Sequence, residues 1–124
     1  MVIIMTNNNI YTYALSLIGE TESSLGISDY DARAPILLAG IIGGLSPFNR
    51  ELGGEEQSFV STVDMTDDFP LDNRLTSAAA YMLAADLILD ENLELYTALL
   101  ASANRMIADE MKRATVTAPI TEVY

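Results

Sequence analysis

Residues 69–96, FPLDNRLTSAAAYMLAADLILDENLELY, contain the pattern that decides the fold. Apolar residues recur there at steps of three and four, which indicates a helix with an apolar stripe. Its centre, AAAYMLAA (residues 78–85), has a single polar side-chain group, the tyrosine hydroxyl. A helix that is apolar around its circumference must be covered on more than one side. We therefore expect this helix to be buried, and the question is what covers it.

The same spacing resumes after a short polar turn, DEN (residues 90–92). So short a turn predicts an antiparallel pair of helices, near residues 70–90 and 92–113. Upstream, apolar stripes predict helices near residues 8–18, with a cap at Asn8 or Asn9 and an end at Gly19, and near residues 29–46. The β-branched, proline-containing residues 114–124 predict an extended tail. The predicted fold class is all-α, a single domain of four helices.

The predicted second helix contains a proline and three glycines. Pro35 lies too far inside to begin the helix, so it predicts either a separate first turn or a kink. Gly40, Gly43 and Gly44 lower helix propensity but leave the backbone bare, which would let a neighbouring element approach closely.

An arm, residues 50–68, interrupts the helical pattern. Its second half, QSFVSTVDM (residues 57–65), is rich in β-branched and aromatic residues without a helical period, which predicts an extended segment or a loose hairpin around Gly53 and Gly54. A lone hairpin is marginal in water. We therefore expect the arm to be mobile in a free monomer and to become ordered against a neighbouring molecule.

The amino-acid composition limits the functions that this protein can have. The 124 residues carry 18 acidic and 6 basic side chains, a formal net charge of -12, and neither cysteine nor histidine. Thiolate nucleophiles, disulfides and the usual neutral-pH base are thereby excluded. So acidic a chain does not favour a phosphate-gripping surface. The apolar runs fall short of the roughly 18 residues that span a bilayer, and no signal peptide is apparent, so we expect a soluble intracellular protein without a membrane partner.

The densest acidic cluster, Asp64, Asp67 and Asp68, precedes the third predicted helix. Two of these carboxylates could bind a divalent cation, but helix capping and solubility explain them without a metal, and no metal-binding motif surrounds them. We expect no enzymatic activity, no metal and no cofactor. Arg33, Arg50 and Arg74 lie near predicted helix ends and are either ordinary surface residues or clamps that face carboxylates of a neighbouring subunit.

Two stretches, DYDARAPILLAGIIGGLSPFNREL (residues 29–52) and DDFPLDNRLTSAAAYMLAADLILDENLELYTALLASANRM (residues 67–106), resemble the small head-to-tail connector (adaptor) proteins of tailed bacteriophages and prophages. In that family a short helix precedes a long one, and a loop or β-arm leads into a helix with Pro-Leu and Ala-Ala-Tyr signatures. One departure is the last helix, which in the family often carries a further aromatic residue that ASANRMIADEM (residues 101–111) lacks. The positions that match the family pattern are Arg33, Ala34, Pro35, Asn49, Pro70, Leu71, Leu75, Ala79, Ala80, Tyr81, Leu83 and Ala84.

The resemblance implies a structural virion protein of the neck, present in the host cytoplasm during assembly. It implies a ring of identical subunits, dodecameric as in the family, that docks beneath the portal protein, extends the DNA channel and receives a stopper or tail-completion protein. DNA would pass an acidic wall without specific binding, and the next subunit would cover one side of AAAYMLAA. The alternative from another class is a small acidic helical protein-binding module, a regulator or DNA mimic. The candidate subunit or partner contacts are Arg33, Asn49, Arg50, Phe59, Val63, Arg74, Ala79, Tyr81 and Ala84.

Overall fold

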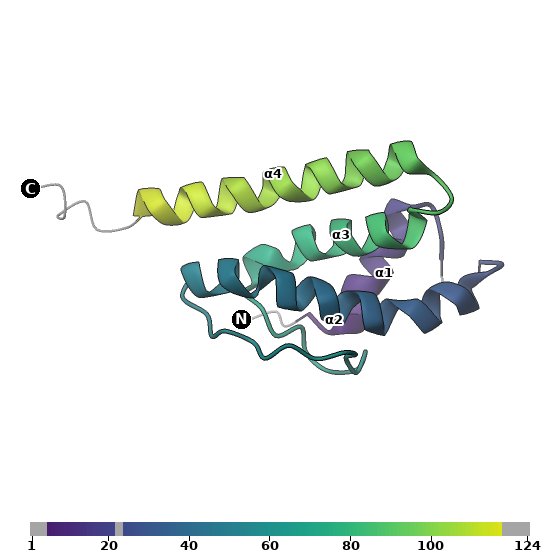
Figure 1. Ribbon diagram of the computed structural model, residues 1–124, viewed down its shortest axis with the longest axis horizontal. Coiled ribbons are helices and arrows are strands. Elements are labelled where there is room, and N and C mark those ends of the chain that lie inside the picture. The colour runs from purple at the N-terminus through teal and green to yellow at the C-terminus, as the bar shows by residue number, and fades with distance from the viewer. Residues whose placement is uncertain (1–4, 22–23, 118–124) are drawn as a thin grey trace, which may run out of the picture.

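The computed structural model describes residues 5–21 and 24–117, with side chains described as far as residue 114, and these residues form an all-α fold (Figure 1). Its four α-helices match the predicted number, and a short 3-10 turn precedes the third. The elements are α1 (Asn7–Leu17), α2 (Ile27–Glu51), η1 (Asn73–Leu75), α3 (Thr76–Ile88) and α4 (Leu93–Thr117).

The alanine-rich helix α3 is the centre of the fold. It packs against α1, α2 and α4, and Figure 1 shows it between α2 and α4 with α1 crossing it. Ala79 and Ala84 have no exposed surface. The three helices of the same chain cover most of this segment, with Tyr81 and Met82 half-buried, and the expected contact with a neighbouring subunit remains a prediction. Small side chains on α3 allow those helices to approach closely.

The first helix begins earlier than predicted. Thr6, and not Asn8 or Asn9, is its N-cap: the Asn9 backbone N–H donates to Thr6 Oγ1 at 3.1 Å, and the Thr6 N–H donates to Asn9 Oδ1 at 2.9 Å. This reciprocal pair is a capping box built with asparagine in the place where glutamate or glutamine is usual. The predicted end at Gly19 is confirmed, since Gly19 has the left-handed conformation (φ 76°) that follows a helix C-terminus.

Helix α2 is longer at both ends than the predicted 29–46. It begins after Gly26, which is left-handed (φ 81°), and continues to Glu51 through Pro35 and Pro47. Of the two alternatives considered at Pro35, a separate first turn and a kink, the separate first turn is therefore excluded. A proline removes one backbone hydrogen bond, but burial of Leu45 and Asn49 on either side of Pro47 holds this last part of the helix against the core.

The connecting segment, residues 52–72, forms no strand, so the extended segment or loose hairpin predicted within residues 50–68 is not confirmed. The only β-type pairing of residues 52–72 is an isolated antiparallel bridge between Thr6 and Asp68. The physical reason is that its backbone is paired with helices: the Val63 N–H donates to the Pro35 carbonyl at 3.3 Å, and the Gln57 N–H donates to Ser46 Oγ at 2.8 Å. The segment therefore lies along α2 of its own chain (Figure 1).

Helix α4 continues to Thr117, so residues 114–117, assigned to the extended tail, are helical. Nothing in the sequence stops the helix before Pro119, which disfavours helical conformation in the residue that precedes it. Residues 118–124, the rest of the predicted tail, lie outside the described residues.

Candidate interaction surfaces

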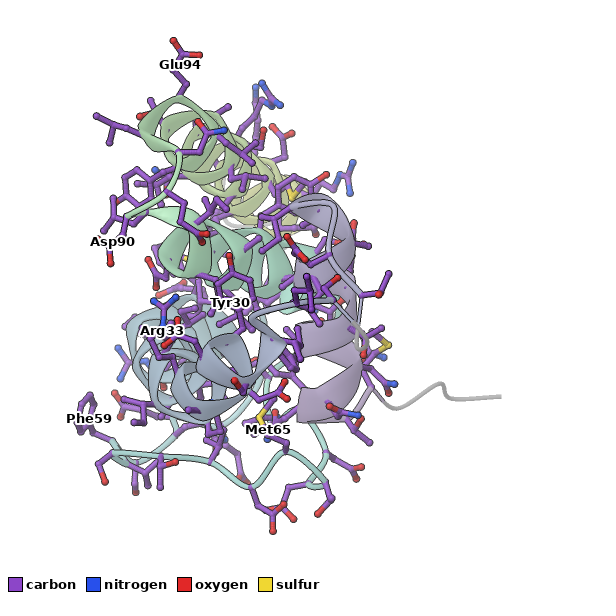
Figure 2. All side chains as sticks on the ribbon, turned by 90° about the vertical axis from the view of Figure 1, so that its right-hand side faces the viewer. Tyr30, Arg33, Phe59, Met65, Asp90 and Glu94 are labelled. Atoms are coloured by element: carbon purple, nitrogen blue, oxygen red, sulfur yellow. The ribbon has the colours of Figure 1, made fainter. Side chains whose placement is uncertain are left out.

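Arg33 ties two helices of its own chain together. Its Nε donates to Asp29 Oδ2 at 3.1 Å, and its Nη2 donates to the Leu87 carbonyl at 3.1 Å, near the C-terminus of α3, where helical carbonyls lack partners. The guanidinium also lies 5.6 Å from the centre of the Tyr30 ring. Figure 2 shows Tyr30 and Arg33 below Asp90 at this end of the molecule. The side chain is one third exposed, so most of its bonding capacity is used within the protomer.

Arg74 and Arg50 also find carboxylates within the chain. Arg74 makes a two-point contact with Asp72, through Nε at 2.9 Å and Nη2 at 3.0 Å, which lowers the pKa of the Asp72 carboxyl. Arg50 lies 3.7 Å from Glu56 and is largely exposed. Each of the three candidate clamps thus has a partner in its own protomer, and a contact with another subunit remains a prediction.

Asn49 is a buried polar residue with several hydrogen bonds inside the protomer, and it does not lie on the surface. It is 1 % exposed, its Nδ2 donates to the Glu55 carbonyl at 2.8 Å, and its Oδ1 accepts the Asp72 N–H at 2.7 Å. Its own carbonyl accepts the Gly54 N–H at 2.9 Å. Asn49 therefore fixes the beginning and the end of the connecting segment to α2.

The other candidate contacts differ in how much surface they offer. Phe59 is 78 % exposed, and the neighbouring Val60 is also exposed, so the connecting segment carries an outward apolar pair. Val63 is half-buried. Tyr81 is half-buried with its ring edge-on to Tyr13, the ring centres being 6.1 Å apart. Of the nine candidates, Arg50, Phe59 and Arg74 are exposed, while Asn49, Ala79 and Ala84 are buried.

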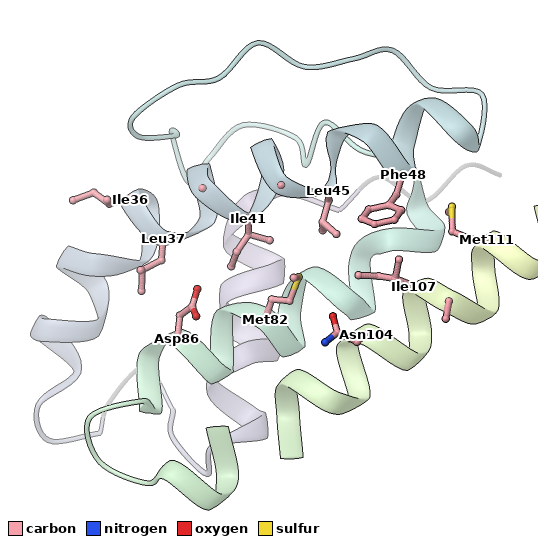
Figure 3. Close-up of a pocket in the computed structure, with 13 residues that line it drawn as sticks. Ile36, Leu37, Ile41, Leu45, Phe48, Met82, Asp86, Asn104, Ile107 and Met111 are labelled. Carbon is pink, nitrogen blue, oxygen red and sulfur yellow. The ribbon is translucent and has the colours of Figure 1, made fainter. Parts of the chain in front are cut away.

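An apolar groove between α2 and α4 was not predicted. α3 forms its floor, and its volume is about 590 Å³ (Figure 3). It exists because α2 and α4 both pack on α3 but scarcely contact each other. Its walls are apolar, and the rim residues Ile36 and Phe48 are 60 % and 36 % exposed. The residues that characterise it are Ile36 and Phe48 of α2, Met82 and Asp86 of α3, and Ile107 and Met111 of α4.

Among the residues that the structure describes, Asp86 is the one ionisable residue that lines this groove. Figure 3 shows its carboxylate on the face of α3 that is turned toward α2. Burial raises the pKa of Asp86 above its ordinary value, and no other influence on that pKa is resolved. A carboxylate of this kind is destabilised by lost hydration without the compensation of a cationic neighbour.

Replacing Asp86 with asparagine is expected to stabilise the protein at neutral pH. Because the pKa of Asp86 is raised, the folded state holds its proton more tightly than the unfolded chain, and stability is lost as pH rises through the folded pKa. Asp86→Asn removes that loss, so its stability advantage over the parent should be present at pH 7 and shrink as pH falls toward about 4. Urea denaturation of both proteins at several pH values measures the difference, and an advantage independent of pH would contradict this assignment.

Two glycines of α2, Gly40 and Gly44, line the same groove with bare backbone. A methyl group added to either would have no heavy atom from another part of the fold within 4 Å. At Gly43, on a different face, the added methyl would lie 3.1 Å from Phe59 Cδ2. The groove therefore has free space above α2 for an atom of another molecule.

Gly40→Ala and Gly44→Ala are each expected to stabilise the protein by up to about 1 kcal/mol, since alanine favours a helix and meets no obstacle. Gly43→Ala should gain less, because Phe59 must move. Thermal unfolding of the three variants gives the order. Equal gains at all three positions would show that Phe59 does not pack on α2.

The acidic loop forms a turn. Asp64 Oδ1 accepts hydrogen bonds from the Thr66 N–H at 2.8 Å and the Thr66 hydroxyl at 2.7 Å, and these bonds lower the pKa of Asp64. Burial and a hydrogen bond to Glu91 raise the pKa of Tyr30 to about 12. Within residues 5–21 and 24–117, no group of three or more acidic side chains is arranged to hold a metal ion. In the same part of the chain, no helix has the length and apolarity needed to cross a membrane.

Comparison of the chain with protein-family models, characterised proteins and solved structures finds no match.

Proposed function

We propose that this protein is a head-to-tail connector of a tailed bacteriophage or prophage, a structural protein that forms a ring beneath the portal. The order of the elements carries the proposal: a short helix, a long helix, a non-helical connecting segment, and a buried alanine-rich helix. The connector family has this order, and the residues that match its pattern fall in α2, in the segment just before α3 and in α3 itself.

The charge and the exposed surface support the same function. A net charge of -12 suits the wall of a channel through which DNA slides without adhering. The exposed Phe59 and Val60 on the connecting segment are apolar residues of the kind found in protein interfaces. In this proposal they contact the next subunit or the tail-side stopper, and the portal protein binds the ring from the head side.

Serine at both Phe59 and Val60 is expected to weaken ring assembly and to leave the fold intact, since neither side chain belongs to the buried core. The matched control is Leu25→Ser, which removes a fully exposed leucine elsewhere. The test is to co-express each variant with the portal protein encoded by the same genome and to measure particle mass. The proposal expects parent and control to form portal-bound rings and the double variant to lose them, and a chain that never joins the portal would refute it.

A small acidic protein-binding module, a regulator or DNA mimic, is the second candidate function. The apolar groove favours it, because such a groove can hold a partner without any ring. The same co-expression separates the two functions. A binding module stays unassociated with the portal at all concentrations, whereas a connector does not.

A further inference from the structure

The groove between α2 and α4 has the length and the surroundings of a site that a further helix would fill. It runs from Ile36 to Phe48 along α2, roughly 18 Å at 1.5 Å per residue. Two helices flank it and α3 lies beneath it (Figure 3), which is where another helix would complete a bundle. Bare backbone at Gly40 and Gly44 permits the close approach that helix pairs use, and Met82 and Met111 supply adaptable apolar side chains.

The negative charge of Asp86 determines which charge the occupant of the groove should carry. Asp86 is the one ionisable group lining this apolar groove, and no ion pair of its carboxylate is found within residues 5–21 and 24–117. An apolar occupant alone would bury the carboxylate further without a partner, which is costly. An occupant with one cationic side chain would instead form a charge-assisted hydrogen bond with it.

Three apolar segments of this chain do not supply that chemistry. Residues 118–124, APITEVY, contain one glutamate and no lysine or arginine. A second copy offers exposed apolar residues at Leu89 and Leu93, but Asp90 and Glu94 lie beside them. It also offers Phe59 and Val60, but residues 51–73 contain no cation. Each of these three segments would bring acidic or neutral groups toward Asp86.

We propose that the groove binds an apolar helix of another protein, and that this helix places one lysine or arginine against Asp86. The apolar face of the helix lies on Gly40, Gly44 and the two methionines, and the cation reaches the carboxylate on the floor. This inference does not rest on the connector assignment, because it follows from the groove and its charge alone.

The probe is a hydrocarbon-stapled 18-residue helical peptide with a leucine and alanine face and one central lysine. A second peptide carries norleucine in place of the lysine. Each is titrated into isotopically labelled protein while backbone amide signals are followed. The proposal expects the lysine peptide to bind more tightly and to shift signals of Gly40, Gly44 and their neighbours first.

Three variants make the test specific. Asp86→Asn should weaken binding of the lysine peptide by about tenfold, and it should not weaken binding of the norleucine peptide, which no longer buries an unpaired carboxylate. Asp90→Asn, which removes the same charge from outside the groove, should change neither affinity. Gly44→Leu, which fills the groove where a side chain meets no neighbour, should abolish binding of both peptides.

Four results would overturn the proposal. The first is that neither peptide shifts the groove signals, and the second is that Asp86→Asn preserves the preference for lysine. The third is that deletion of residues 118–124 alone exposes the groove and raises peptide affinity, which would make the tail the occupant. The fourth is a dimer, seen by sedimentation, that Gly44→Leu dissociates, which would make a second copy the occupant.

Discussion

Replacing Ala84 with tryptophan is expected to lower the free energy of unfolding by about 3 kcal/mol or more, a large part of the stability of a small domain. Ala84 has no exposed surface and lies on α3, which α1, α2 and α4 surround. An indole at this position has no space, so the surrounding helices must move apart. Ala79→Trp should have a comparable effect, because Ala79 is equally buried.

The matched control is Leu25→Ala, since Leu25 is fully exposed and its loss should change stability by less than about 0.5 kcal/mol. Urea denaturation followed by circular dichroism measures all three variants. If either tryptophan variant unfolds at the same urea concentration as the parent, α3 is not the tightly packed centre of the domain.

Replacing Asn49 with alanine is expected to cost about 2 to 3 kcal/mol, although the residue is polar. The change removes the side chain that pairs the Glu55 carbonyl and the Asp72 N–H, and it leaves both groups without that partner in a buried place. Asn49→Asp preserves the shape but turns an acceptor toward the Glu55 carbonyl, so it should also destabilise. Arg50→Ala, at the exposed next position, is the control and should have little effect.

Gly54 supplies an independent check on Asn49. A methyl group at Gly54 would lie 2.5 Å from Asn49 Nδ2, so Gly54→Ala should destabilise the parent by displacing that side chain. In the Asn49→Ala background the obstacle is gone, and the same substitution should cost much less. A double-mutant cycle measures this coupling. Additive effects would mean that Asn49 does not hold the connecting segment.

The sequence predicted the buried central helix because the signal is local: AAAYMLAA has no polar face, and such a helix must be covered. It could not show that α1 and α2 of the same chain cover it, since that depends on packing between distant residues. The predicted helix boundaries were wrong where capping and tertiary contacts outweighed the helix preference of the local sequence. Thr6 caps α1 in place of Asn8 or Asn9, and α2 continues through Pro47 because Leu45 and Asn49 on either side of it are buried.

The interaction surfaces were less predictable than the helices. Asn49 was selected as a contact residue from family resemblance, but its partners in the connecting segment and before η1 become visible only in the fold. The sequence predicted a close approach by another element at Gly40, Gly43 and Gly44, but among the described residues only Gly43 of these three has such a neighbour, Phe59. Nothing local indicated that the adjoining space would be an open groove with Asp86 on its floor, because α2, α3 and α4 form it together.

The most direct test of the connector function is a cryo-electron microscopy reconstruction of the neck of particles produced from the genome that encodes this chain. The predicted result is a twelve-subunit ring of this protein directly beneath the portal, with the connecting segment of each subunit at an interface. A neck in which other proteins account for all the density beneath the portal, with this chain absent from the particle, would contradict it.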